Sequence, residues 1–231
     1  HAPKPGLPLV SASLVLRAGQ ASNPADRPGL ATFVAAMLPE GTTTRSAQQV
    51  AQTLAALGAT MHAQAGAEES RVDFSGLKAS AREGLALMAD VVQNPAFATA
   101  EVDRKRSQLL AALAQTREQP DELAGVVASR VLFGDGHPLA PASLGTEASL
   151  KAIDSAALRS FWQGQYRPER SALVVAGDLT EAELRALVEP LFGAWKPAGE
   201  AAPVQPLPPA RPVAARTVLV DQPGAPQTAL A

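Results

Sequence analysis

Apolar residues recur at helical spacing near the start of the chain, in "GLATFVAAMLPEGT", residues 29–42. They fall at positions i, i+3, i+4, i+7 and i+8, and they are Leu30, Phe33, Val34, Met37 and Leu38. This spacing predicts a helix with one buried face. The opposite face carries only the small side chains of Thr32, Ala35 and Ala36.

Short runs of apolar and β-branched residues predict four strands. Two runs are mostly apolar, as is typical of buried strands, at residues 9–16 and 171–178. In a third run, residues 70–78, apolar and polar residues alternate. Residues 59–66 precede this last run and are joined to it by three residues, so the two segments predict an antiparallel pair.

Six further helices follow from periodicity and from residues typical of helix ends. They are expected from 46 to 58, 80 to 93, 98 to 118, 121 to 133, 154 to 166 and 180 to 195. Three of them begin with an expected capping box, at Ser46 and Gln49, Ser80 and Glu83, and Thr180 and Glu183. Asp121 is the expected cap of the fourth, and residues 134–150 are expected to form a loop.

The order of elements, β-α-α-β-β-α-α-α-α-β-α, favours an α+β layer fold over a parallel doubly wound sheet. We expect residues 1–195 to form one α+β domain. Residues 196–216 contain six prolines in 21 positions and predict a stiff, extended linker. Residues 217–231, "TVLVDQPGAPQTALA", are expected to be the first strand of a second, truncated domain.

Composition excludes several classes of function. With 46% hydrophobic and 18% charged residues the chain can bury a core, and its net charge of -2 gives no support to nucleic-acid binding. There are no cysteines, which excludes disulfides, thiolate metal sites and a cysteine nucleophile. No apolar run is long enough for a membrane span. The compartment does not follow, and for a bacterial source both periplasm and cytoplasm fit.

Several segments, in order, resemble the pitrilysin/insulinase family of zinc peptidases, which includes the mitochondrial processing peptidase. They are "LPLVSASLVLRAGQASNPADRPGLATFVAAMLPEGT", "LAALGATMHAQAGAEESRVDFSGL", "FGDGHPLAPASLGTEASLKAI" and "YRPERSALVVAGDL", followed by "LVEPLFGAW". The resemblance covers nearly the whole chain. It implies an antiparallel sheet with helices packed on one side, as in the processing-peptidase fold.

Active members of that family carry an H-x-x-E-H motif, in which two histidines bind zinc and the glutamate acts as general base. The resemblance places the two histidines at Thr32 and Ala36, and the glutamate at Ala35. The third ligand, a glutamate on a later helix, falls at Ala111 or Ala112. These five positions are interpreted as a vacated metal site, without catalytic or metal-binding residues. The alternative is an ordinary amphipathic helix that packs closely through small residues.

Other candidate chemistry is weaker. His62 and His137 are far apart in sequence, without a second ligand at metal spacing, so we expect a packed or hydrogen-bonded His62 and a turn role for His137. No Walker, G-x-G-x-x-G or G-x-S-x-G pattern occurs. Tyr166 and Arg167 precede a core strand, and the substrate-binding arginine and tyrosine of the family's last domain are not transferred to them.

The resemblance implies a non-catalytic half of a metallopeptidase that is inactive alone and contains no cofactor. Its expected partners are a zinc-bearing catalytic half, on the same polypeptide or on a separate subunit, and a peptide substrate. Its role would be to form part of the substrate chamber and to support the catalytic half in peptide hydrolysis. The alternative is a structural scaffold subunit with the same fold and no proteolytic partner.

Overall fold

The computed structural model describes residues 1–4, 6–134, 137–140, 142–203, 206–209, 214–215 and 217–221. Within these ranges five strands form one sheet, in the order β1-β5-β2-β4-β3. Their bounds are β1 Ala2–Pro3, β2 Leu9–Leu16, β3 Thr60–Ala65, β4 Ser70–Leu77 and β5 Ser171–Gly177. The short β1 pairs with β5 in parallel, and every other pair is antiparallel.

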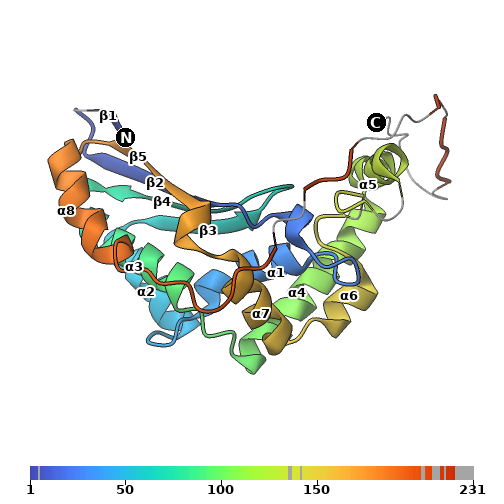
Figure 1. The fold of residues 1–231 in the computed structure, drawn as a ribbon, viewed down its shortest axis with the longest axis horizontal. Coiled ribbons are helices and arrows are strands. Elements are labelled where there is room, and N and C mark those ends of the chain that lie inside the picture. Colours follow the sequence, from blue (N-terminus) through green and yellow to red (C-terminus); the bar gives the residue numbers. More distant parts are fainter. Residues whose placement is uncertain are drawn as a thin grey trace.

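The helices cover one side of this sheet and extend beyond it at one end (Figure 1). Their bounds are α1 Leu30–Met37, α2 Ala47–Leu57, α3 Ala81–Gln93, α4 Thr99–Glu118, α5 Pro120–Phe133, α6 Glu147–Ala152, α7 Ser155–Gln165 and α8 Glu181–Phe192. Helix α1 lies centrally, in contact with β3, β4, α4 and α7. The expected α+β fold with helices on one side of an antiparallel sheet is confirmed.

Alternation along the strands separates a buried face from an open one. On β2 the side chains of Val10, Leu14 and Leu16 are buried under the helices, while Ser11 between them points to the other, exposed face. Burial of such side chains supplies the main driving force for folding. The sheet therefore has one solvent-facing side in the described structure, as antiparallel sheets commonly do.

Close packing between β4 and α3 depends on a glycine. A Cβ atom on Gly84 would lie 2.1 Å from two ring atoms of Phe74, so α3 can approach the sheet only without a side chain there. Trp162 of α7 donates its indole N–H to the carbonyl of Val92 of α3 over 2.8 Å. Both contacts join helices to the core at fixed positions.

Two of the three expected capping boxes are present, at Ser46 with Gln49 and at Thr180 with Glu183. The box at Ser80 is wrong. Its hydroxyl donates instead to the carbonyl of Leu57, at the end of α2, over 3.0 Å. The hydroxyl thus donates to a tertiary acceptor, whereas in a capping box it would accept from the Glu83 N–H.

The cap expected at Asp121 is also wrong. Helix α5 begins two residues earlier than that cap implies, with Pro120 at its first position, and Gln119 is its N-cap residue. Proline suits that position because its fixed φ is helical and its missing N–H would have no helical partner.

The expected loop over 134–150 contains the start of a helix, α6. Thr146 and Ser149 form a reciprocal capping box, with the Ser149 N–H donating to the Thr146 hydroxyl over 3.1 Å. Serine takes the position that glutamate or glutamine holds in the usual box. Residues 135, 136 and 141 of this segment lie outside the described residues.

After α8 the chain runs back across the helices. It passes α7 and continues to α5 at the far end of the molecule (Figure 1). We call residues 199–203 and 206–208 the strap. Residues 217–221 have no strand assignment, and 222–231 lie outside the described residues, so the domain boundaries and the expected strand over 217–231 stay predictions.

Candidate functional site

The start of α1 is set by backbone geometry and not by a capping side chain on its own N-cap residue. Gly29 holds that position with a φ of 88°, and a Cβ atom there would lie 2.4 Å from the Leu144 carbonyl oxygen. Asn23 accepts a hydrogen bond from the Ala31 N–H over 2.8 Å. This satisfies one of the N–H groups that have no partner in the first turn of a helix.

A second segment, far along the chain, is fastened to the same turn. Thr32 donates its hydroxyl to the Ser143 carbonyl over 2.7 Å, and Ser149 donates to the Pro28 carbonyl over 2.7 Å. Gly145 has a φ of 83° and lies so close that its Cβ would be 2.1 Å from the Pro28 oxygen. The first turn of α1 is thus held by the 143–149 segment.

The five positions predicted from the resemblance lie on two adjacent helices. Thr32, Ala35 and Ala36 are on α1, and Ala111 and Ala112 are on α4, which packs against α1. Ala35 is only 1% exposed, Ala36 and Ala112 are half-buried, and Ala111 is exposed. The structure therefore brings the two helices together, with Ala111 as the outlying position.

The side chains at these positions do not suit zinc. Alanine has no donor atom, and the Thr32 hydroxyl is already used for Ser143. Across the described part of the chain, no group of three or more His, Cys, Asp and Glu side chains is arranged to hold a metal ion. The five positions themselves supply neither a zinc ligand nor a carboxylate base.

Ion pairs fix the far end of α1 to α4. Glu40, in the turn Leu38–Glu40, pairs with both Arg104 and Lys105 of α4, and its side chain is only 13% exposed. A hydrogen bond from Arg104 to Glu101, with Glu40 close by, raises the pKa of the Arg104 guanidinium. These contacts hold α1 and α4 in register on the side opposite the 143–149 segment.

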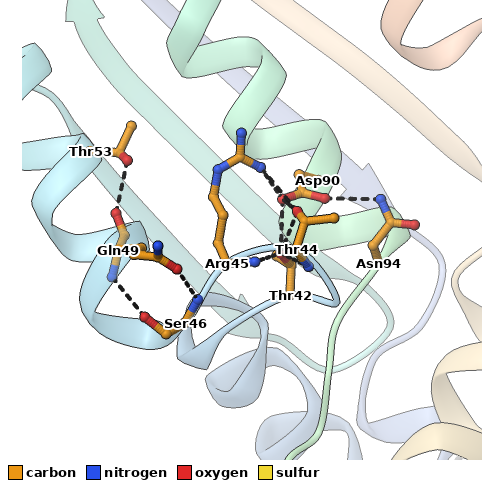
Figure 2. A network of polar contacts seen from close by, with 8 residues as sticks. All are labelled: Thr42, Thr44, Arg45, Ser46, Gln49, Thr53, Asp90 and Asn94. Atoms are coloured by element: carbon orange, nitrogen blue, oxygen red, sulfur yellow. Dashed lines mark hydrogen bonds and ion pairs between the residues drawn. The ribbon is translucent and has the colours of Figure 1, made fainter.

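The loop after α1 is organised around one carboxylate, Asp90 of α3 (Figure 2). Its Oδ2 accepts hydrogen bonds from the Thr42 hydroxyl over 2.9 Å and from the Thr44 hydroxyl over 3.2 Å, and it pairs with Arg45. Asn94 donates to Oδ1 over 3.0 Å. Each oxygen of a half-buried charge is thereby satisfied, so we interpret Asp90 as a structural residue.

Neither of the two internal histidines is part of α1 or α4. His137 accepts a hydrogen bond from the Leu139 N–H over 3.1 Å and stacks on Phe133, which confirms its role in a turn. His62 is exposed on the open face of the sheet, so the expectation of a packed side chain is wrong. Its strand position points it away from the helices.

Sequence reasoning missed the function of the "YRPER" segment in holding the strap. Arg167 is buried and donates to the Gly199 carbonyl over 2.7 Å, and Arg170 donates to the Ala202 carbonyl over 2.7 Å. The Ala202 N–H donates in turn to the Gly164 carbonyl over 3.0 Å. No local pattern would have revealed these pairs, because their acceptors are main-chain carbonyls 32 residues further along.

Tyr166, the neighbour of Arg167, is fully buried. Burial raises the pKa of its phenol to about 12, although the nearby Ser70 hydroxyl acts in the opposite direction. Ser70 itself donates to the Ala18 carbonyl. Among the residues that the structure describes, the Tyr166 hydroxyl has no hydrogen-bond partner.

Comparison with protein families accounts for the fold. The family model described as insulinase, peptidase family M16, matches residues 3–132, more than half of the chain. The chain belongs to the M16 peptidase family. A second M16 model, described as the inactive domain, matches residues 152–231. The first part of this second match comprises α7, β5 and α8. These elements belong to the same α+β unit as the residues matched by the first model, because β5 pairs with β2.

The relatives of this M16 chain have contrasting names. An uncharacterized zinc protease of Mycobacterium leprae is 33% identical over 165 residues, which are 71% of this chain and 37% of that protein. A non-peptidase homolog of Helicobacter pylori is 28% identical over 173 residues, 75% of this chain and 40% of that protein. The chain spans less than half the length of both.

Among solved structures, the M16 inactive domain from Pseudomonas fluorescens is similar to this chain with a TM-score of 0.79 and 28% identity. The match covers 89% of this chain and 49% of that one. Within the described ranges, no helix is both long and apolar enough to cross a lipid bilayer.

Proposed function

We propose that this M16 chain is the first domain of a non-catalytic half, which forms part of a substrate chamber and supports a zinc-bearing catalytic half. The observation that carries the proposal is the chemistry of the α1–α4 pair. The positions aligned with the family's ligands and base hold Thr32, Ala35, Ala36 and Ala111 or Ala112. None of these side chains can bind zinc or transfer a proton at neutral pH.

The rest of the site supports the same role. Both ends of α1 are fastened, by Thr32 to Ser143 at its start and by Glu40 to α4 at its end. A pair of helices that has no metal to hold it together needs other contacts to keep its geometry. These contacts preserve the family's framework, so a chamber wall of the same shape is retained without its chemistry.

A second candidate is a scaffold subunit with no proteolytic partner. One relative, from Helicobacter pylori, favours this candidate, because that entire protein is named a non-peptidase homolog. The two candidates differ in one measurable property. A chamber wall changes peptide hydrolysis by a catalytic partner, whereas a scaffold does not.

The test uses the chain together with the H-x-x-E-H member of the same family from the same genome. Each protein alone and an equimolar mixture are assayed on a library of quenched fluorescent peptides, with and without a chelator. We expect no cleavage by the chain alone and at least tenfold faster, chelator-sensitive cleavage by the mixture than by the partner alone. Size-exclusion chromatography with light scattering should detect the complex.

Two results would contradict the proposal. Chelator-sensitive cleavage by the chain alone would show that it has its own metal centre. A partner that is fully active alone and unaffected by the chain would favour the scaffold. As a matched control, Arg185→Ala on the exposed surface of α8 should behave as the unmodified chain does, since Arg185 pairs only with glutamates of its own helix in the contacts described.

A further inference from the structure

A cavity of about 540 Å³ lies at the far end of the molecule, and the strap forms one of its walls. The other walls come from the last turns of α4, from α5, from the loop before α1, and from residues within 137–140 and 142–146. We call it the α4–α5 cavity. Its volume falls in the range of cavities that bind small molecules or peptide side chains, roughly 300–1,000 Å³.

The strap contributes one apolar side chain between two prolines. Pro206, Leu207 and Pro208 all line the cavity, and Leu207 is half-buried while the prolines on either side are exposed. Leu113, Leu123 and Val126 of the helices line the same cavity. Leu207 is therefore the least exposed of the three strap residues that line the cavity.

Hydrogen bonds to main-chain atoms of the strap anchor its first part, residues 199–203. Arg167 and Arg170 hold the carbonyls of Gly199 and Ala202, and Ala202 lies against Gly164, where an added Cβ would be only 3.0 Å away. Prolines favour an extended backbone and lose little entropy when they bind, which is why proline-flanked segments are common ligands of apolar grooves. The strap has this composition.

We propose that the α4–α5 cavity is a docking site for an extended segment with an apolar residue between prolines, and that residues 206–208 of the same chain are its occupant. The strap is an internal ligand of moderate fit, because cavity volume remains beside Leu207. A segment with a larger apolar side chain fills more of that volume and binds more tightly.

The test supplies the segment as a separate peptide. A fluorescently labelled peptide with the sequence of residues 205–210, Gln-Pro-Leu-Pro-Pro-Ala, is titrated with the full chain and followed by polarisation. Arg170→Ala releases the strap at its anchor. Leu207→Lys releases it at the cavity, where a charged side chain would replace the apolar one beside Leu123 and Val126 of the lining.

We expect saturable binding of the peptide to both released variants and at least tenfold weaker binding to the unmodified chain. The tethered strap competes there at an effective concentration on the order of millimolar. Leu219→Lys is the matched control, since Leu219 is 87% exposed and lies beyond the strap, and it should bind the peptide as weakly as the unmodified chain. Replacing the peptide's leucine by phenylalanine should strengthen binding severalfold, and replacing it by lysine should abolish it.

The proposal is overturned if neither released variant binds the peptide, or if both bind it no better than the unmodified chain does. Thermal unfolding of each variant verifies that it is folded, and Val126→Lys in the Arg170→Ala background must abolish the binding. None of these measurements needs a catalytic partner, so their outcome is independent of the proposed function.

Discussion

The hydroxyl of Thr32 and the carbonyl of Ser143 are joined by a hydrogen bond of 2.7 Å between residues 111 positions apart. Thr32 lies in the first turn of α1, at the position where the family resemblance places a zinc-binding histidine. The Thr32 side chain thus has a tertiary structural function. It connects α1 to the segment that leads into α6.

Removal of this hydroxyl should loosen that connection. Thr32→Val keeps the shape of the side chain and should lower the free energy of unfolding by about 0.5–1.5 kcal/mol, because the Ser143 carbonyl loses its donor. Urea denaturation followed by tryptophan fluorescence measures the change. Thr53→Val is the control, since Thr53 bonds only to Gln49 one turn earlier in α2, and it should be nearly neutral. Equal effects of both variants would contradict the tertiary role.

Zinc binding should need several changes at once. The unmodified chain and the single variant Ala36→His should hold well under one zinc per chain and show no chelator-sensitive peptidase activity, since one imidazole is not a site. The triple variant Thr32→His, Ala36→His and Ala112→Glu should bind zinc stoichiometrically. Metal analysis of tag-free protein at neutral pH measures both.

The same triple variant with Ala111→Glu in place of Ala112→Glu is the control for that experiment. Ala111 is exposed and Ala112 is half-buried, so we expect weaker zinc binding when the acid is at 111. Activity in Ala36→His alone, or no zinc in either triple variant, would show that the alignment of α1 and α4 with the family motif is wrong.

Glycines on two helices should respond oppositely to alanine. Gly84→Ala should destabilise the protein by about 1–3 kcal/mol, because the new methyl group would overlap the Phe74 ring. Gly125→Ala on α5 should stabilise it by about 0.5–1 kcal/mol, since no atom lies within 4 Å of the added Cβ and alanine is the better helix former. Thermal denaturation of the pair measures both effects, and a shared sign would contradict the packing of α3 on β4.

Tyr166 should make the fold sensitive to alkaline pH. Its pKa is raised to about 12 in the folded chain, above the ordinary value near 10, so its stabilising contribution is complete below pH 10 and is lost as pH rises through 12. The full loss is roughly 3 kcal/mol for a shift of two units. As the chain has one tyrosine, the absorbance of the phenolate reports this residue alone.

Tyr166→Phe should remove that part of the alkaline destabilisation. Near neutral pH it should change the free energy of unfolding by less than about 1 kcal/mol, because the hydroxyl that it removes has no partner in the described structure. A phenol that titrates near pH 10 in the folded chain would contradict the burial of Tyr166.

Local patterns predicted those parts of the fold whose contacts are local. The 30–38 periodicity predicted α1, and the boxes at Ser46 and Thr180 are closed by residues three positions away. The box at Ser80 is absent because its hydroxyl donates to the Leu57 carbonyl of another helix and does not accept from the Glu83 N–H. Helix α6 was missed because a short helix with serine at the third position resembles a polar loop.

The candidate site divides in the same way. The residue types at Thr32, Ala35 and Ala36 can be read from the sequence, and their interpretation as a vacated metal site stays a prediction. The contacts that hold α1 in place could not be predicted, because Ser143 and Glu40 reach their partners only through the tertiary fold. The path of the strap was equally hidden, as it depends on two arginines whose targets are main-chain atoms.

The place of β5 in the sheet has a consequence for synthesis on the ribosome. β5 lies between β1 and β2, although its residues are made long after both. Until Ser171–Gly177 has left the exit tunnel, β2 has an unpaired edge, with the apolar side chains of its buried face already present. Synthesis proceeds at roughly 5–20 residues per second, so the interval between the appearance of β2 and that of β5 lasts on the order of ten to thirty seconds. We therefore expect the nascent chain to bind chaperones during that interval. Ribosome-bound chains in which residues 171–177 are still inside the exit tunnel should be digested by protease, while chains that have exposed these residues should resist.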